Sequence, residues 1–186
     1  MPLLDIIGVD ACQRSFCIGF AFLSGETEDD YMWVLERLRS LYETCNARLP
    51  SVILTDRCLA CMNAVSTCFP AATSLLCLWH ANKAVLQHCQ PTFKNIEADV
   101  WDTFYQSWHL IMRSLDEEAF KENVRELERK FLPKYLQEVG YIKTTWLDPY
   151  KEKLVKAWVD QHSHFGNVVT SRVEGNILSS IYLKFY

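Results

Sequence analysis

The sequence predicts a mixed α/β fold, with a short sheet first and a block of helices after it. Residues 3–9 and 16–23 are apolar runs rich in β-forming residues, separated by the polar DACQRS. Residues 52–55 form another short apolar run, and residues 31–42 carry apolar side chains at helical spacing. Beyond His88 the pattern is helical alone. A chain of 186 residues, 49% of them hydrophobic, can bury one sizeable core, so we expect a single compact domain.

The first half of the chain indicates two paired strands, a helix and a third strand. We expect the first two apolar runs to pair antiparallel. Because the chain opens directly in a strand, we expect an N-terminally truncated piece of a longer protein. Thr27 and Asp30 form a capping-box pattern in front of the helix. The strand at 52–55 follows a helical crossover, so we expect it to lie parallel to a central neighbour.

The second half indicates helices. After a strand at 75–78, helical spacing runs through 93–111 and then, behind a cap at 114–117, through 120–131.

Two further helix starts are visible near the C-terminal end. Asp148 and Pro149 have the pattern of an N-cap and a first helical residue. A last helix is expected to begin at Thr170 or Ser171, with Glu174 in its first turn.

Composition limits the setting of the protein. A disulfide scaffold would be shorter and richer in turns, so we expect reduced thiols in the cytosol or nucleus. The net charge of -4 argues against a surface that binds nucleic acid everywhere. No apolar run is long enough for a membrane span, and no secretory signal is visible. The eight cysteines all lie in the first half: Cys12, Cys17, Cys45, Cys58, Cys61, Cys68, Cys77 and Cys89.

Asp56 is the first candidate site residue. It follows the apolar strand at 52–55, and an acidic side chain at the end of a strand is held in place while the turn leaves it open to solvent or metal. Asp56 could equally cap a helix that begins at Arg57. Glu174 has a similar second interpretation, as the partner of Ser171 in a capping box.

Several segments together resemble the catalytic core of Mutator-like element (MULE) transposases, a family with fungal members and plant regulators derived from them. These segments are MPLLDIIGVD, ETEDDYMWVL, ILTDRCLACMNAVSTCFP, LCLWH and TSRVEGN. They cover nearly the whole chain, and their ordered combination is more specific than any one of them.

The resemblance implies an RNase H-like mixed sheet with its first strand missing. Residues 1–90 and 166–186 would form the core, with 91–165 as a helical insertion before the last helix. Asp56 matches the second Asp of a DDE triad and Glu174 matches its Glu. Such carboxylates hold two Mg²⁺ or Mn²⁺ ions that activate the attacking oxygen and stabilise the leaving one in phosphodiester transfer.

One part of the family pattern is absent. The first Asp of the triad lies on a strand before the PLL segment, and this sequence begins at that segment. Asp5 and Asp10 lie within and at the end of the following strand, so neither is a natural replacement, although Asp10 is the nearer candidate. As written, the chain is expected to lack a complete metal site.

A zinc site is a separate hypothesis. Cys58-x2-Cys61 and Cys77-x2-His80 have fifteen residues between them, a spacing that suits tetrahedral Zn²⁺. Against it, Cys58 and Cys61 share one face of a predicted helix, where small thiols pack as core. The resemblance supports only Cys77 and His80, as a CxxH motif.

Other candidates have simpler interpretations. Trp79 could stack on a base near a cleavage site, but an aromatic residue between apolar elements is more often core. Lys151, Lys153 and Lys156, with Arg172, could contact phosphate, although lysines scattered on a helix are usually a solvated face.

Two functions follow from these patterns. The first is a transposase-like DDE domain for metal-dependent DNA cleavage and strand transfer, incomplete without its first Asp. The second is a noncatalytic DNA- or protein-binding module derived from a transposase and stabilised by zinc or by its core alone. The resemblance implies a nuclear protein whose partner is transposon terminal-repeat DNA; a homo-oligomer is left open, and no membrane partner is expected.

Overall fold

The computed structural model describes residues 1–10, 12, 14–94, 98–162 and 180–185, with the backbone alone at 98 and 180–185. The chain divides into two compact units. The sheet unit contains residues 1–79 and 162–186, and the helical unit contains residues 80–161. This division replaces the single compact domain that the composition predicts.

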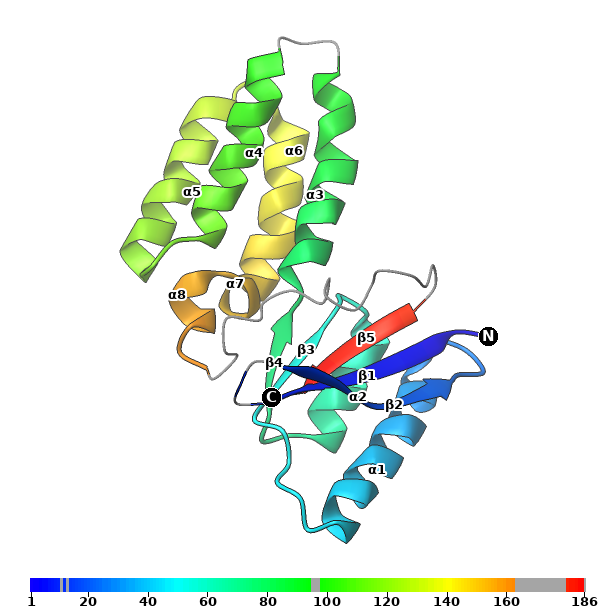
Figure 1. The fold of residues 1–186 in the computed structure, drawn as a ribbon. Helices are drawn as coiled ribbons and strands as arrows, with labels where there is room; N and C mark the ends of the chain where they lie inside the picture. The colour runs from blue at the N-terminus through cyan, green and yellow to red at the C-terminus, as the bar shows by residue number, and fades with distance from the viewer. Residues whose placement is uncertain (11, 13, 95–97, 163–179, 186) are drawn as a thin grey trace. The chain divides into compact units, whose positions relative to one another are not determined.

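Five strands form one mixed sheet in the sheet unit (Figure 1). Its order is β2-β1-β5-β3-β4, with β5 at the centre. Strand β1 pairs antiparallel with β2 and parallel with β5, and β3 pairs antiparallel with β5 and parallel with β4. The strands are β1 Leu3–Val9, β2 Ser15–Phe22, β3 Val52–Thr55, β4 Thr73–Leu76 and β5 Ser180–Phe185.

The structure confirms the antiparallel β1–β2 pair and the strand that ends before Asp56. Three predictions need correction. Strand β3 has its parallel partner at the sheet edge, in β4, whereas its central neighbour β5 is antiparallel. Strand β4 ends at Leu76, so the predicted strand at 75–78 is shifted. Residues 180–185 form a strand and not the end of a helix.

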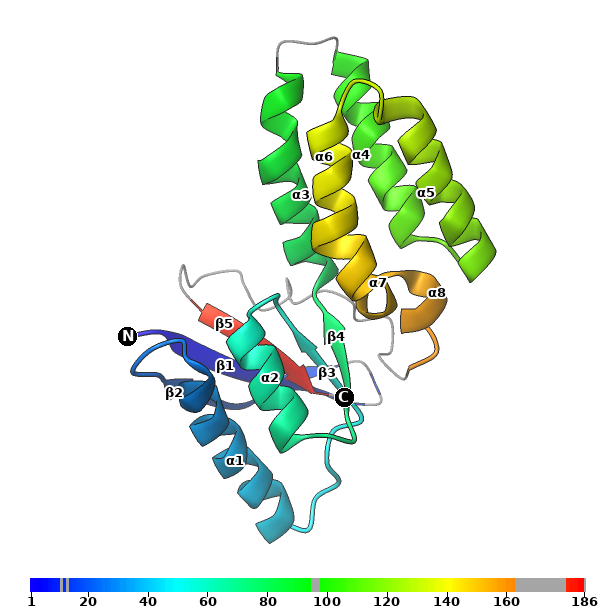
Figure 2. The same cartoon turned by 180° about the vertical axis from the view of Figure 1, so that it is seen from behind.

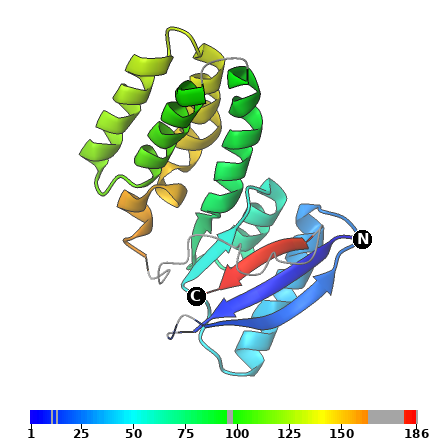
Figure 3. The ribbon, with the colours of Figure 1, turned by 45° about the horizontal axis from the view of Figure 1, so that its top comes forward.

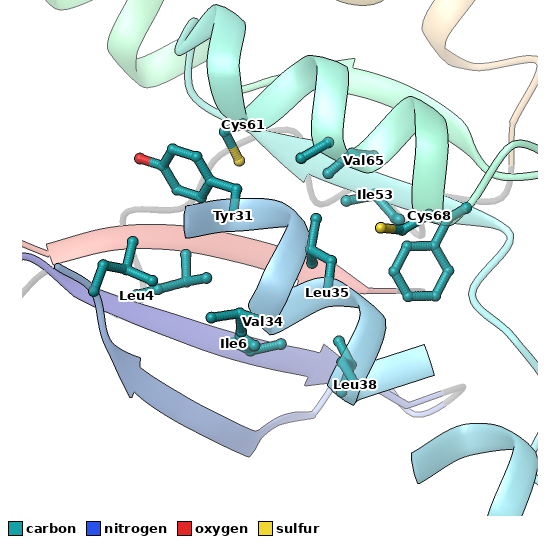
Figure 4. Packing of buried hydrophobic residues seen from close by; sticks show 13 residues of the cluster. Leu4, Ile6, Tyr31, Val34, Leu35, Leu38, Ile53, Cys61, Val65 and Cys68 are labelled. Atoms are coloured by element: carbon teal, nitrogen blue, oxygen red, sulfur yellow. The ribbon is translucent and has the colours of Figure 1, made fainter. Parts of the chain in front are cut away.

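Helices α1 (Glu28–Thr44) and α2 (Leu59–Cys68) pack over one face of the sheet (Figures 2 and 4). Leu4 and Ile6 of β1 contribute to the same buried cluster as Ile53 of β3. Because side chains alternate along a strand, Asp5 belongs to the opposite face of β1. The two helices therefore cover strands on both sides of β5 with one shared apolar layer.

Helix α1 begins as its sequence predicts. The Thr27 hydroxyl accepts a hydrogen bond from the Asp30 backbone N–H, and the Asp30 carboxylate accepts one from the Thr27 backbone N–H. This reciprocal capping box satisfies two amides that the helix itself leaves without partners.

The described residues of the helical unit are mostly helical (Figure 3). Trp108 is buried and donates a hydrogen bond to the Asn82 side chain over 2.8 Å. Phe93 packs against Phe104 and Tyr135, with ring centroids 5.1 and 4.5 Å away. The elements are α3 Leu78–Phe93, α4 Ala98–Met112, α5 Glu117–Phe131, α6 Leu136–Ile142, the π-helical η1 Lys143–Leu147, α7 Asp148–Leu154 and α8 Lys156–Val159.

Helix boundaries differ from the predicted ones in three places. The expected helix over 93–111 is two elements, because α3 ends at Phe93 and α4 begins at Ala98. The cap of α5 is Asp116, whose carboxylate accepts from the Ala119 N–H over 2.8 Å. Asp148 is the first residue of α7 and not its N-cap, since the chain is already helical in η1. Every helix in the described part of the chain is too short or too polar to cross a lipid bilayer.

Candidate functional site

The candidate site lies at the carboxyl ends of β3 and β4. These strands are parallel, with Thr55 paired to Leu76, so the residues that follow them emerge at the same edge. Asp56 follows β3 and Cys77 follows β4. The Cys77 N–H donates to the Thr55 carbonyl over 2.8 Å, which extends the ladder by one bond. The sheet therefore brings Asp56 and the first residue of the CxxH motif together.

The Asp56 side chain is anchored locally and partly exposed. Its Oδ1 accepts a hydrogen bond from the Cys58 N–H over 3.2 Å. Helix α2 begins at Leu59 with Cys58 as its N-cap, so the expected helix start at Arg57 is wrong and Asp56 precedes the cap. Asp56 instead forms an Asx-type turn, which holds a carboxylate at the strand end.

Asp10 is placed away from Asp56 by the strand directions. Strand β1 is parallel to β5, and β3 is antiparallel to β5, so β1 and β3 run in opposite directions. Their carboxyl ends, and with them Asp10 and Asp56, lie at opposite edges of the sheet. Asp10 is also engaged by Arg14, whose Nε and Nη2 each lie 2.8 Å from Oδ2. The backbone hydrogen bond from the Arg14 N–H, and then this side-chain pairing, lower the pKa of Asp10.

The strand registers with β5 place Asp5 and Asp56 at the same position along the strand direction. In the parallel ladder Asp5 pairs with Tyr182, and in the antiparallel ladder Leu54 pairs with Lys184. Continuing the second register by two residues brings Asp56 opposite Tyr182 as well. Asp5 and Asp56 are then two strand spacings apart, roughly 10 Å between their backbones. Burial raises the pKa of Asp5 above its ordinary value.

The sequence alone does not indicate Asp5 as a metal ligand, because no motif surrounds this acidic residue inside its strand. The available signal was its position among apolar neighbours in LLDIIGV, where a carboxylate is costly unless the structure uses it. Glu174, the predicted partner of Asp56, lies outside the described residues. The pairing of Asp56 with Glu174 therefore stays a prediction.

The four residues of the zinc hypothesis have different surroundings. Cys61 is buried in the core cluster, and Cys58 lies 3.7 Å from the Tyr31 hydroxyl. Cys77 is buried, whereas His80 is the first residue of the helical unit. Burial, with a smaller effect from the Asp56 charge, raises the pKa of the Cys61 thiol. No group of three or more Cys, His, Asp or Glu side chains among the described residues is arranged to hold a metal ion. The zinc site stays a prediction.

We expect thiol labelling at pH 8 to separate the cysteines into two groups. Cys12, Cys17 and Cys45 are exposed and should react first. Burial, with a smaller contribution from Glu138, raises the pKa of Cys89 to about 12, so its thiolate is scarce and its reaction slow. Mass spectrometry after timed alkylation would measure the order, with protein unfolded in urea as the control. Fast labelling of Cys89 in the folded protein would contradict this arrangement.

The remaining motif residues lie at the start of α3. Trp79 and His80 are in its first turn and are partly buried. Trp79 is thus neither a fully buried core residue nor a fully exposed one, and its stacking on a base stays a prediction. The predicted phosphate contact Arg172 lies outside the described residues.

Comparisons with known proteins show a family and several plant proteins that this chain resembles. Residues 1–84, which include Asp5, Asp56, Cys77 and His80, match the MULE transposase domain. The Arabidopsis thaliana protein FAR1-RELATED SEQUENCE 6 is 25% identical over 154 residues, which are 76% of this chain and 21% of that protein. FAR-RED IMPAIRED RESPONSE 1, also from Arabidopsis thaliana, is 29% identical over 98 residues, 52% of this chain and 11% of that protein.

A fungal relative is similar over a shorter segment. The PKS-NRPS hybrid synthetase cheA of Chaetomium globosum is 28% identical over 94 residues, 50% of this chain and 2% of that protein. The matched part of the chain spans about a fifth or less of the length of these curated relatives. Residues 1–84, just under half of the chain, are therefore similar to the MULE transposase domain.

Proposed function

We propose that the sheet unit is an RNase H-like core for metal-dependent DNA cleavage and strand transfer. The observation that carries this proposal is the position of Asp56, held partly exposed at the carboxyl end of β3 beside Cys77. The mixed sheet supports it, because an antiparallel pair, a crossover helix and a strand ending in Asp56 occur in the order that the resemblance implies. The family match over residues 1–84 supports it further.

In this proposal Asp56 and Glu174 are ligands of Mg²⁺ or Mn²⁺. Hard divalent ions prefer carboxylate oxygens. A pair of such ions would activate the attacking oxygen and stabilise the leaving oxygen at a phosphodiester. Asp5 is the described carboxylate that the strand register brings to the level of Asp56, so it is the third ligand that we test. Asp10 is not part of the proposed ligand set, because it lies at the other edge of the sheet from Asp56.

The same proposal implies a binding partner and a cellular location for the protein. A transposase core acts on DNA, with transposon terminal repeats as the expected substrate, and it acts in the nucleus. The whole-chain charge of -4 means that phosphate contacts must be confined to a limited surface. Cys77, the cysteine of the CxxH motif, would then lie beside the reacting strand, because the β3–β4 pair brings it to the same edge as Asp56.

Manganese binding tests the metal site directly. Isothermal titration calorimetry of the protein with Mn²⁺ should show binding that Asp56→Asn and Glu174→Gln each remove. Nicking of supercoiled DNA in Mn²⁺ should fall by about 100-fold or more in the same variants, because a metal ion supplies several kcal/mol of charge stabilisation. Asp5→Asn is expected to weaken Mn²⁺ binding as well.

Asp10→Asn is the matched control, since it removes an equal charge at the opposite sheet edge. It should leave Mn²⁺ binding unchanged. Thermal unfolding of each variant would separate lost binding from lost folding. If Asp56→Asn folds normally and binds Mn²⁺ as tightly as the unaltered protein, Asp56 is not a ligand and the nuclease proposal fails.

The second candidate is a noncatalytic DNA- or protein-binding module. It is favoured by one relative, whose name refers to an impaired far-red response and not to transposition. This candidate predicts DNA or protein binding that is insensitive to Mn²⁺ and to Asp56→Asn. Gel-shift measurements with and without Mn²⁺ would distinguish it from the first.

A further inference from the structure

A hollow of about 480 Å³ lies where strand β2 leads into helix α1. This volume is within the range of side-chain and ligand pockets in proteins. The residues that line it do not include Asp56 or Cys77. It is lined by Met1, Phe22, Leu23, Ser24, Asp29, Asp30 and Trp33.

Exposed aromatic rings form the apolar part of this surface. Phe22 is 60% exposed and Trp33 is 57% exposed. Phe20, which is 67% exposed, continues the surface along β2, with its ring centroid 6.2 Å from that of Phe22. At roughly 200 Å² per ring, these three side chains present on the order of 350 Å² of aromatic area. Apolar patches of roughly 300–600 Å² are the largest on a typical monomer and are often functional.

The polar part of the hollow is acidic. The Asp30 carboxylate is fixed by hydrogen bonds from Ser24 and Thr27, which lower its pKa and keep it ionised. The Asp29 side chain is exposed and makes no hydrogen bond or ion pair with any residue that the structure describes. Glu26 and Glu28 are exposed in the same short segment. The aromatic surface therefore has a negatively charged rim.

This charge decides which partner fits. Four carboxylates in one segment repel phosphate, so nucleic acid is an unfavourable occupant. An aromatic surface beside carboxylates instead favours a cation with an apolar stem, through ion pairing and cation–π attraction. Trp33 already attracts a cation within its own helix, since the Arg37 guanidinium carbon lies 5.5 Å from the ring centroid.

We propose that this hollow is a docking site for an arginine- or lysine-bearing segment of a partner protein. The basic side chain lies against Trp33 and Phe22, with its charged end at Asp29. The apolar residues that flank it in the partner cover Phe20. None of Trp33, Phe22 and Asp29 is a proposed metal ligand, so binding of the basic segment and binding of Mn²⁺ can be measured independently.

The test uses the protein and two blocked pentapeptides. One peptide alternates valine with arginine, and the other has glutamate in place of arginine. The readout is the Trp33 indole N–H signal in ¹H–¹⁵N NMR spectra, identified with the Trp33→Phe variant. We expect a saturable shift with the arginine peptide and none with the glutamate peptide. Asp29→Asn should raise the dissociation constant about three- to fivefold, and Phe22→Ala about tenfold.

The matched controls are Asp102→Asn and Leu110→Ala, an acidic and an apolar exposed position on α4. Neither should change peptide binding. Backbone signals of β1 would confirm that each variant is folded. The proposal is overturned if the glutamate peptide shifts Trp33 equally, or if Asp29→Asn binds as tightly. It is also overturned if the Trp33 signal moves with protein concentration alone, because the patch would then belong to a contact between two copies of the chain.

Discussion

Replacing Leu35 by alanine should lower the free energy of unfolding of the sheet unit by about 3–5 kcal/mol. Leu35 is fully buried in the middle of helix α1. It belongs to the cluster that joins this helix to α2 and to Ile53 of β3 (Figure 4). Removing three carbon atoms there loses their transfer out of water and leaves a cavity between two helices and a sheet that cannot close it fully.

Leu41 gives a matched control in the same helix, because its side chain is 53% exposed. Leu41→Ala should change stability by no more than about 0.5 kcal/mol. Urea unfolding followed by circular dichroism would give both values, and amide hydrogen exchange in α1 and β1 would localise them. Equal effects of the two substitutions would show that Leu35 is not at the centre of this core.

The first part of the fold could be predicted from local sequence, since each local signal agrees with the tertiary contacts. The capping box at Thr27 and Asp30 lies directly before an apolar helical face, and the structure has both. The runs that form β1 and β2 are separated by a short, mostly polar segment, so an antiparallel pair of neighbouring strands is the direct solution. Asp56 at the end of β3 follows from the same kind of agreement.

The later elements could not be predicted as well, because short apolar segments suit both helix and strand. Leu75 to Leu78 is an apolar run whose first part is strand and whose last residue opens α3. Residues 173, 177 and 181 have helical spacing, yet Ser180–Phe185 is a strand paired on both sides, with β1 and β3. Pairing between distant segments decided this outcome, and local spacing carries no information on it.

The candidate site shows the same limit. Sequence order identified Asp56 and the start of the CxxH motif, which the parallel pair β3–β4 brings to one edge. The position of Asp5 relative to Asp56 depends on how β1 and β3 each pair with β5. A single sequence does not reveal these registers. Asp10 illustrates the converse, because it follows β1 closely in sequence, yet the strand directions place it at the opposite edge of the sheet from Asp56.

Trp108→Ala should destabilise the helical unit by about 3–5 kcal/mol. Trp108 is fully buried on α4, and its indole N–H donates to the Asn82 side chain on α3 over 2.8 Å. The substitution removes a large apolar group and also leaves Asn82 without its donor. Leu110→Ala on the same helix is the control, since Leu110 is 57% exposed, and it should cost no more than about 0.5 kcal/mol.

The hydrogen bond between Trp108 and Asn82 can be separated from the packing by a double-mutant cycle. Asn82→Ala leaves a buried indole N–H without an acceptor and should cost about 1–3 kcal/mol, whereas in a Trp108→Phe background the same change should cost about 1 kcal/mol less. Amide hydrogen exchange gives the decisive readout, because the buried cluster around α1 consists of residues of the sheet unit. Protection should fall in α3 and α4 and stay unchanged in α1. Loss of protection in α1 on substitution of Trp108 would mean that the chain unfolds as one cooperative body.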